Sequence, residues 1–534
     1  GPNGRSGGQI AQRPIVIVLR AEPPMLNDRL DRMGLRSQVT VTMATRNDRE
    51  VTIPILAERL PSQSDRSWTV NSDGTMRTIY SLRPNLLWQD GQPLTASDFT
   101  FAYRVYTDNA IPVTTRLPET LMSEVIPRDD RTVEIVWREP YVDAGALIQS
   151  QLAPLPAHLL EDLYGRDKTA FATSTFWTSE EFVSDGPYRV NRWEHGVAIY
   201  LEANPYFVFG PPKIDRIEIR AVTDGNTVVA GFLAGSIDFS EYTAIDVDQA
   251  VTLRDRWQMD QAGKVYSESL FGTRYMEFQH REVPGWQRAL EDVRVRQALG
   301  HSLDRTTLAE ALQHGFGDPA DTGYPRSAAI FPRIDQTIAK YPYDLRRAQE
   351  LLGQAGWTKG GDGLYRDTNG RPLDVEVRVT GEREDEATLI DADWRKSGIS
   401  ASIFVVPRAQ TNDVEFRVNF PGVATSATTD VVAPSQVTTS QAPTAANKFT
   451  GKNRGSYSNP ELDRLYDLSL KTLDAQKRDD ILVDLERLYT SDVAHLVLYY
   501  QPRAAASRGI EGIKPPVRDT YLWNLWEWTL QPVI

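Results

Sequence analysis

The first part of the chain alternates short apolar runs with turn residues. Residues 15–19 (IVIVL) are an uninterrupted apolar, β-branched run, which is typical of a buried strand. Between 132 and 137 an apolar residue recurs at every second position, which predicts a strand with one buried face. Residues 68–82 predict a hairpin, because two β-rich runs flank Asp73-Gly74, a strong signal for a tight turn.

Helical periodicity begins at Thr95. Residues 95–106 predict a helix, because Thr95 can cap it and three aromatic side chains then fall on one face. A shorter helix is predicted over 224–233, ending near Gly235. Similar patterns predict helices within 286–313, 344–355, 460–470 and 475–489, and strands over 188–190, 214–219, 373–379, 401–406 and 496–500. Strands and helices are mixed throughout, so we predict an α/β (mixed α+β) protein.

Residues 422–456 differ in texture from the rest of the chain. They are rich in Ser, Thr, Ala and Gln and contain few large apolar side chains. This composition predicts a long loop, and its place between two structured regions favours a functional role.

Length and composition restrict the class of protein. A chain of 534 residues exceeds the roughly 250–300 residues at which one hydrophobic core stops growing, so two or more lobes are expected. The net charge is −13, from 59 basic and 72 acidic residues, and no run of Lys and Arg provides a nucleic-acid footprint. The chain has no cysteine, which excludes disulfides and thiol catalysis. No apolar run approaches the roughly 20 residues that span a bilayer.

The N-terminus is polar and rich in glycine. We expect residues 1–13 to form a flexible leader, and Gly1-Pro2 is typical of what a protease leaves after removing a tag. A lipoprotein tethered through an N-terminal cysteine needs such a spacer, so a lipid-anchored precursor fits this leader.

Six phrases occur in a consistent order between about residues 80 and 500. They are LRPNLLWQDGQPLTASDF at 82–99, GPYRVNRWEHGVAIYL at 186–201, AGFLAGSID at 230–238, VRVRQALGHSLDR at 293–305, YPYD at 341–344 and GSYSNPELD at 455–463. Together they resemble the peptide/nickel-type (oligopeptide- and dipeptide-binding) family of binding proteins of bacterial ABC importers. The phrases consist mostly of turn glycines, strand ends and packing aromatics, so they indicate the fold more than the ligand.

The resemblance implies a two-lobed fold of the type II periplasmic-binding-protein kind (cluster C, with an extra subdomain in lobe one). Lobe one is then expected to contain residues 14–270 plus 502–534, and lobe two residues 280–498. Residues 271–279 and 499–501 are expected to be the hinge crossings.

The resemblance also implies the function of a solute-binding protein, which captures an oligopeptide or similar small solute and delivers it to an ABC permease in the membrane. It implies no catalysis, no cofactor and no nucleic-acid partner. We expect a monomer that is periplasmic or on the cell surface, and lipid-anchored in its precursor.

Ligand-binding residues are expected in four segments that face the cleft in relatives. These are the loop after the first strand, the first crossing, the segment from residue 419 and the aromatic segment near the C-terminus. The candidates are Glu22, Met25, Arg274, Tyr275, Glu277, Asn419, Phe420, Gly422, Ser426, Asp430, Tyr521, Trp523 and Trp526.

One departure from the family pattern concerns the peptide's amino terminus. Peptide-binding relatives carry a Trp after the glycine and, a few residues later, an Asp that pairs with the α-ammonium. Here Val423 follows Gly422, and Ser426 stands where the Asp is expected. A hydroxyl does not provide the charge-assisted bond that a desolvated ammonium needs. Either Asp430 or Glu415 replaces the Asp, or the ligand has no free amino terminus.

Other ligand classes and activities have weaker support. Twelve tryptophans allow an oligosaccharide-binding alternative, with Trp394, Trp523, Trp526 and Trp528 as the candidates outside the scaffold phrases. The six histidines are scattered without the spacing of metal ligands, so no metal is expected. The chain contains no GxSxG, P-loop or GxGxxG motif, and a cleft-based hydrolase with two carboxylates is the weakest alternative.

Overall fold

The structure of the protein is a computed structural model. It describes residues 13–27, 35, 38–49, 51–113, 116–148, 151–242, 244–267, 272–411, 413–428, 431, 433–447, 449, 451–516 and 520–531. The chain forms two compact units. The first comprises residues 1–269 and 503–534, and the second comprises residues 270–502.

The first unit is built on a sheet of seven strands in the order β13-β21-β12-β1-β11-β10-β9. The bounds are β13 Lys264–Tyr266, β21 Ala505–Ser507, β12 Phe239–Ser240, β1 Ile15–Leu19, β11 Arg216–Ala221, β10 Ala198–Ala203 and β9 Tyr188–Glu194. Strand β1 pairs in parallel with β11 and β12. Both of its faces are covered, since Ile15 and Ile17 belong to one hydrophobic core and Val16 and Val18 to another. This burial explains the uninterrupted apolar run.

A second sheet of the first unit is antiparallel. Its strands are β4 Ala57–Arg59, β6 Met76–Leu82, β8 Thr132–Trp137 and β7 Met122–Asp129, with β5 Trp68–Val70 paired to β6. The predicted hairpin at Asp73-Gly74 is therefore confirmed, as β5 and β6. Short pairs complete the unit: β2 Ala44–Arg46 with β3 Thr52–Pro54, and β22 Ile510–Glu511 with β23 Thr529–Leu530.

The first unit contains five helices among its described residues, two of which were predicted from the sequence. The helices are α1 Ala96–Thr107, α2 Ala157–Arg166, α3 Lys168–Ala172, α4 Gly225–Ala234 and α5 Val247–Asp260, with 3-10 turns η1 Glu119–Leu121, η2 Thr175–Thr178 and η8 Tyr521–Glu527. Thr95 and Asp98 form a capping box at the start of α1. Helix α4 ends at Gly235, which takes the left-handed conformation. Both predicted helices are thus confirmed.

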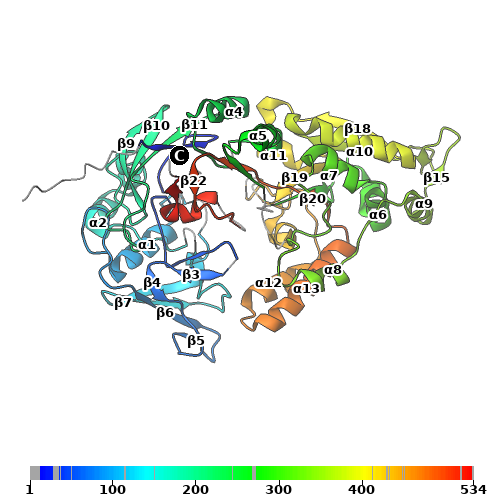
Figure 1. Cartoon of the computed structure of the whole chain (residues 1–534). Helices are drawn as coiled ribbons and strands as arrows, with labels where there is room; N and C mark the ends of the chain where they lie inside the picture. Colours follow the sequence, from blue (N-terminus) through cyan, green and yellow to red (C-terminus); the bar gives the residue numbers. More distant parts are fainter. Residues whose placement is uncertain are drawn as a thin grey trace, which may run out of the picture. The chain divides into compact units, whose positions relative to one another are not determined.

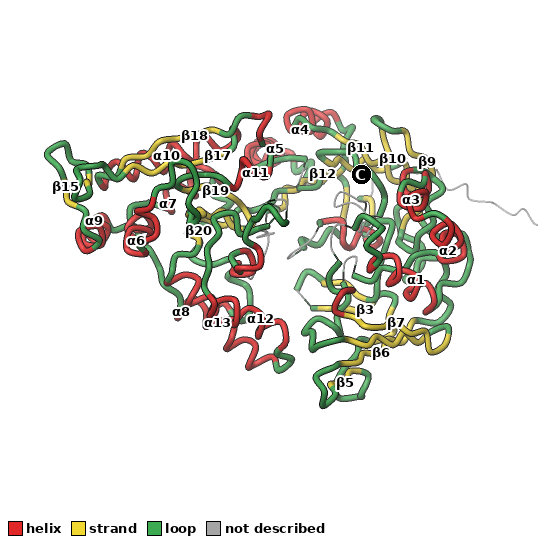
Figure 2. The backbone as a smooth tube through the Cα atoms, turned by 180° about the vertical axis from the view of Figure 1, so that it is seen from behind, coloured by secondary structure: helices red, strands yellow, loops and turns green. Residues whose placement is uncertain are grey.

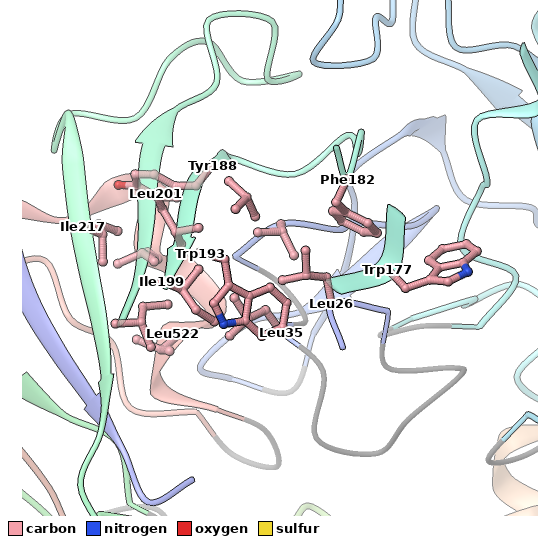
Figure 3. Close-up of a cluster of buried hydrophobic side chains, with 14 of the residues drawn as sticks. Leu26, Leu35, Trp177, Phe182, Tyr188, Trp193, Ile199, Leu201, Ile217 and Leu522 are labelled. Carbon is pink, nitrogen blue, oxygen red and sulfur yellow. The ribbon is translucent and has the colours of Figure 1, made fainter. Parts of the chain in front are cut away.

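The main core of the first unit joins distant segments. Leu26, Leu35, Trp177 and Phe182 lie close together in this core, beside Trp193 and the strands β9 to β11 (Figure 3). Trp177 Nε1 donates a hydrogen bond to the Phe171 carbonyl at 2.7 Å, so the indole is buried with its polar atom satisfied.

The second unit is built on a sheet in the order β18-β17-β19-β14-β20 (Figure 1). The bounds are β18 Ser400–Val405, β17 Asp374–Val379, β19 Val423–Thr428, β14 Thr273–Phe278 and β20 His495–Tyr500. β17 runs parallel to β18 and β19, while β14 is antiparallel to β19 and β20. A short pair, β15 Thr358–Lys359 and β16 Tyr365–Arg366, lies outside this sheet.

The helices of the second unit form two groups (Figures 1 and 2): α7 and α10 pack against the sheet, whereas α8 and α12 pack against α13. The helices are α6 Val293–His301, α7 Arg305–Gln313, α8 Phe331–Thr337, α9 Leu345–Gln354, α10 Glu384–Ser397, α11 Val414–Val418, α12 Pro460–Lys471 and α13 Ala475–Ser491. The 3-10 turns are η3 Arg288–Glu291, η4 Gly381–Arg383, η5 Arg408–Gln410, η6 Ala433–Gln436 and η7 Thr439–Gln441. Strands and helices alternate through both units, which confirms the predicted mixed α/β class.

The prediction of a long loop over 422–456 is wrong at its start. Residues 423–428 form β19, a strand that pairs with β17 on one side and β14 on the other. Val423 and Ala424 are buried there, where small side chains fit between the layers. The composition suggested a loop because the segment has few large apolar side chains. A strand covered on both faces can do without them when the side chains of neighbouring elements fill the core around it.

Candidate functional site

Strand β14 carries three of the predicted site residues at the centre of the second unit. Successive side chains of a strand point to opposite faces of its sheet. Arg274 therefore points to one face of the sheet. Tyr275 and Glu277 both point to the other face. In the register of the sheet Tyr275 lies opposite Ser426, and Glu277 lies opposite both Ala424 and His495. We call the face with Tyr275, Glu277, Ser426 and His495 the Tyr275 face.

Arg274 points to the other face, into the core beside α10. Its Nε and Nη2 donate to the two carboxylate oxygens of Glu386 at 3.0 and 2.5 Å. Tyr499 donates to the same carboxylate at 2.5 Å. Burial opposes ionisation of Glu386, but the charge and hydrogen bonds of Arg274 keep the pKa of that carboxyl below its ordinary value. The guanidinium of Arg274 is therefore occupied by a buried ion pair.

Tyr275 is held on the Tyr275 face by two neighbours. Its ring stacks on the imidazole of His495, and its hydroxyl donates to Gln436 Oε1 at 3.0 Å. Burial, with the charges of Arg454 and His280 nearby, lowers the pKa of His495 to about 3. The imidazole is therefore neutral at pH 7, and Tyr275 packs against an uncharged ring.

Glu277 forms the second buried ion pair of the sheet. Its side chain is fully buried, and its Oε1 accepts a hydrogen bond from Arg454 Nη2. Gly455 places this arginine, because a Cβ at Gly455 would lie 2.1 Å from the Phe278 carbonyl oxygen. Within the described part of the chain, Glu277 Oε2 is buried without a hydrogen-bond partner. One oxygen of this carboxylate is thus unused on the Tyr275 face.

The segment after α11 brings Asn419, Phe420 and Gly422 to the edge of β19. Asn419 Oδ1 accepts from Arg281 Nη2 at 2.8 Å. Phe420 is fully buried, and its carbonyl accepts from Gln279. A Cβ at Gly422 would lie 2.6 Å from the Glu376 carbonyl oxygen, so this position requires glycine. Phe420 and Gly422 therefore shape the backbone, while Asn419 offers a polar group.

Ser426 and the two acids proposed to replace the missing Asp are placed differently. Ser426 is half-buried on the Tyr275 face. Glu415 is exposed on α11. Asp430 lies outside the described residues. Of these groups, only Ser426 is seen beside Tyr275.

In the first unit, Glu22 follows β1 and is engaged by its neighbours. Its carboxylate accepts hydrogen bonds from Trp193 Nε1 at 2.5 Å and from the Gly196 backbone at 2.8 Å, and it lies 3.2 Å from His195 Nδ1. Burial works against the charge, but these hydrogen bonds hold the pKa of Glu22 below its ordinary value. Met25 packs, half-buried, against the main core.

The aromatic segment of the first unit separates into buried and half-buried rings. Tyr521 is fully buried, and Trp523 is 4% exposed with its Nε1 donating to the Lys514 carbonyl at 3.0 Å. Trp526 is half-buried, with ring centroids 5.6 Å from Phe207 and 6.1 Å from Phe209.

Two of the four tryptophans proposed for oligosaccharide binding are not accessible to a ligand. Trp394 and Trp528 are fully buried in the hydrophobic cores of their units, so the expectation that they are available to a ligand is wrong. The indole N–H of Trp394 donates a hydrogen bond to the Leu299 carbonyl, and that of Trp528 donates one to Asn524 Oδ1. A sequence shows that a tryptophan lies outside a known phrase, but not whether helices cover it.

The described residues bring together no three His, Asp or Glu side chains that could hold a metal ion. Among those residues there is also no helix long and apolar enough to cross a membrane. A surface pocket of about 480 Å³ lies in the first unit, lined by residues such as Lys264, Tyr266 and Glu511. No predicted site residue lines it.

Comparison with known proteins decides the family. A sequence model described as "Bacterial extracellular solute-binding proteins, family 5 Middle" matches residues 54–448, well over half of the chain. This chain belongs to that family. The resemblance read from the six phrases is thus confirmed.

Several relatives of this family 5 protein are known. The oligopeptide-binding protein AppA of Bacillus subtilis is 24% identical over 479 residues, which cover 86% of this chain and 81% of AppA. A putative ABC transporter peptide-binding protein of Brucella ovis is 27% identical over 272 residues, about half of each chain (51% and 48%). The structure of NikZ from Campylobacter jejuni, in complex with Ni(L-His), has a TM-score of 0.77 at 21% identity, covering 97% of this chain and 99% of NikZ. These likenesses confirm the predicted fold class.

Several residues of the family 5 protein that shape the Tyr275 face were not among the sequence-based candidates. Gln436, Arg454 and His495 lie far from β14 in sequence, and the register of the sheet and the packing of later segments bring them into contact with it, while Arg417 lies within electrostatic range of Tyr275 and Glu277. Arg454 is the one with a signal, because it precedes the family phrase that begins at Gly455.

Proposed function

We propose that this family 5 protein captures an oligopeptide or a similar small solute and delivers it to the membrane permease of an ABC importer, without chemical turnover. The observation that carries the proposal is the family match over residues 54–448. We place the protein outside the cytoplasm, in the periplasm or on the cell surface, with a lipid anchor on its precursor.

Family membership does not determine the class of ligand, which depends on the residues of this chain's own site. AppA was solved with a nonapeptide, at 20% identity and a TM-score of 0.72 over 97% of this chain and 99% of AppA, whereas NikZ holds Ni(L-His). Likenesses this remote concern the fold alone. A peptide is proposed first because the relatives AppA and the Brucella protein are both named for peptide binding.

The proposed site in the second unit is the Tyr275 face and its edge at Asn419. Tyr275, Glu277, Ser426 and Asn419 offer aromatic, acidic and neutral polar groups there. In the first unit, the proposal keeps the loop of Glu22 and Met25 and the aromatic segment. We also propose that residues 271–279 and 499–501 act as hinges, so that binding closes the two units around ligand.

A second candidate ligand is an oligosaccharide. The half-buried ring of Trp526, which clusters with Phe207 and Phe209, favours it, because aromatic faces stack on the apolar faces of sugars. Phe209 is 46% exposed, so this aromatic group reaches the surface of the first unit.

Native mass spectrometry tests the proposed function. The purified chain is unfolded in guanidinium, dialysed and refolded, then mixed with an equimolar library of random tetrapeptides to octapeptides or with a ladder of gluco-oligosaccharides. We expect saturable one-to-one complexes with peptides that are recovered unchanged after a day. One-to-one complexes with sugars alone would favour the second candidate, and cleavage of either library would overturn the binding-protein proposal.

A further inference from the structure

Arg417 lies on the last turn of α11, directly before the edge of the candidate site. Its side chain is half-buried, and no described residue gives it a side-chain hydrogen bond or an ion pair. Other arginines near that edge have partners: Arg454 pairs with Glu277, Arg378 with Glu376, and Arg281 donates to Asn419 and to carbonyl groups. Among the described residues, Arg417 therefore has no counter-charge in contact.

No carboxylate of the described residues contacts the Arg417 guanidinium. Glu277 lies within electrostatic range, but its Oε1 is taken by Arg454. Glu382 also lies within range, on the exposed turn η4. Burial, and then the like charge of Arg454, lower the pKa of Arg417. A partly buried guanidinium in such surroundings costs stability unless an anion joins it.

Arg417 also shares its surroundings with Tyr275. The electrostatic neighbours of Arg417 include Tyr275, and Tyr275 in turn lies opposite Ser426 in the sheet. The guanidinium therefore lies within electrostatic range of the tyrosine that faces Ser426 in the sheet. An ammonium placed there would meet a positive charge, whereas a carboxylate would meet a guanidinium, whose planar N–H groups match it, and a hydroxyl.

We propose that Arg417 is a specificity residue that binds an anionic group of the ligand, a carboxylate, on the Tyr275 face. This inference rests on the proposed function and names the chemical class of the ligand group that the second unit recognises. It accounts for Ser426, because a carboxylate at this place needs a hydroxyl donor and no aspartate. The carboxylate is supplied by the C-terminus of a peptide, by an acidic side chain or by a small polycarboxylate.

Matched peptide libraries distinguish these sources. The refolded full-length chain is equilibrated with random tetrapeptides lacking Asp and Glu in four forms: free, N-acetylated, C-amidated and capped at both ends. A fifth library contains Asp and Glu and is capped at both ends, and citrate is tested separately. Bound peptides are quantified by mass spectrometry after dialysis. We expect N-acetylation to leave binding unchanged, and loss of every carboxylate to weaken it about tenfold or more.

The variant Arg417→Gln should lose this preference. Its control is Arg408→Gln, which removes the same charge from an exposed residue of η5 in the same unit. We expect Arg417→Gln to unfold at the same temperature as the unliganded wild type or above it, because the substitution removes an unpaired, half-buried cation. Arg408→Gln should keep both the binding and the carboxylate preference.

Phenylglyoxal labelling of arginines, mapped by peptide mass spectrometry, gives a second readout. Arg417 should react in the unliganded chain and be protected by whichever anionic ligand binds. If peptides bind wild type and Arg417→Gln equally, the anion site is overturned and the proposed function stands. If no peptide binds but citrate protects Arg417, a peptide is rejected as the ligand class, and the carboxylate site at Arg417 is supported. If neither peptides nor citrate bind, the anion site is overturned, and the gluco-oligosaccharide ladder decides whether the proposed binding function stands.

Discussion

The ring of Tyr275 stacks on the imidazole of His495, with centroids 4.4 Å apart and planes inclined by 15°. The two residues lie on adjacent strands, β14 and β20, and both are buried. Tyr275 was expected to touch ligand, and its 4% exposure shows that the ring also supports the sheet. Its substitution therefore affects stability as well as binding.

The first prediction separates these two contributions of Tyr275. Tyr275→Ala should lower the free energy of unfolding by about 3 to 5 kcal/mol, because a buried aromatic ring is lost and a cavity is left. Tyr275→Phe should cost about 1 to 3 kcal/mol, because the hydrogen bond from the Tyr275 hydroxyl to Gln436 Oε1 is lost. Urea unfolding followed by circular dichroism measures both. Tyr343→Ala is the control, since Tyr343 is 41% exposed in the same unit, and an equal loss there would contradict this explanation.

The second prediction concerns the buried pair Arg274–Glu386. Arg274→Met should lower the free energy of unfolding by about 3 to 5 kcal/mol, because Glu386 is left as a buried, unpaired carboxylate. The double variant Arg274→Met/Glu386→Leu should recover most of that loss, since no charge then remains in the core. Thermal melts of the single and double variants test this directly. A double variant less stable than Arg274→Met would show that the ion pair is not the source of the effect.

The third prediction is a pH dependence caused by Glu486 on α13. Burial raises the pKa of this carboxyl from 4.5 to about 8, and the Thr322 hydroxyl donates a hydrogen bond to its Oε2 at 3.0 Å. The folded chain therefore keeps a proton that the unfolded chain releases above pH 4.5. The free energy of unfolding should fall as pH rises from 4.5 to 8, by at most about 1.4 kcal/mol per pH unit.

Glu486→Gln should flatten this slope and stabilise the chain at pH 8, because an amide is neutral at every pH. The measurement is urea unfolding at half-unit steps of pH from 5 to 8.5. Glu310→Gln, an exposed position on α7, should leave the slope as in wild type. An unchanged slope in Glu486→Gln would mean that another group titrates.

The fourth prediction tests Ser426 by restoring the acid that peptide-binding relatives carry. Ser426→Asp should pair with Arg417 across the Tyr275 face and remove the preference for a carboxylate, because the new charge neutralises the cation. We expect binding of C-terminally free, N-acetylated peptides to fall about tenfold in the same dialysis assay. Ser426→Asn, of equal size but uncharged, should keep the preference. A loss in Ser426→Asn as large as in Ser426→Asp would indicate a steric effect.

The fifth prediction distinguishes Trp523 from Trp526. Trp523→Ala should lower the free energy of unfolding by about 3 to 5 kcal/mol, because the buried indole is tied to the Lys514 carbonyl. Trp526→Ala should cost less, because its ring is half-buried, and should weaken ligand binding if this aromatic group stacks on the solute. Thermal melts and the native mass spectra report the two effects independently. Normal binding by Trp526→Ala would remove this residue from the site.

Much of the fold could be predicted because its signals are local. The cap at Thr95, the turn at Asp73-Gly74 and the stop at Gly235 depend on residues within one turn of the chain, and each was found where predicted. The strand at 423–428 was missed because its side chains are small, and its strand geometry depends on β14 and β17, which lie on either side of it.

The sequence by itself determined the order of strands and helices, the family phrases and the absence of an acid at Ser426. Only the tertiary structure decided which charges are paired. Arg274 meets Glu386 over 112 residues of chain, and Arg454 meets Glu277 over 177, while Arg417 has no such partner among the residues that the structure describes. Local conformation depends on near neighbours along the chain, whereas ion pairing depends on sheet register and packing, which bring distant residues together. The candidate anion site is therefore a property of the folded second unit.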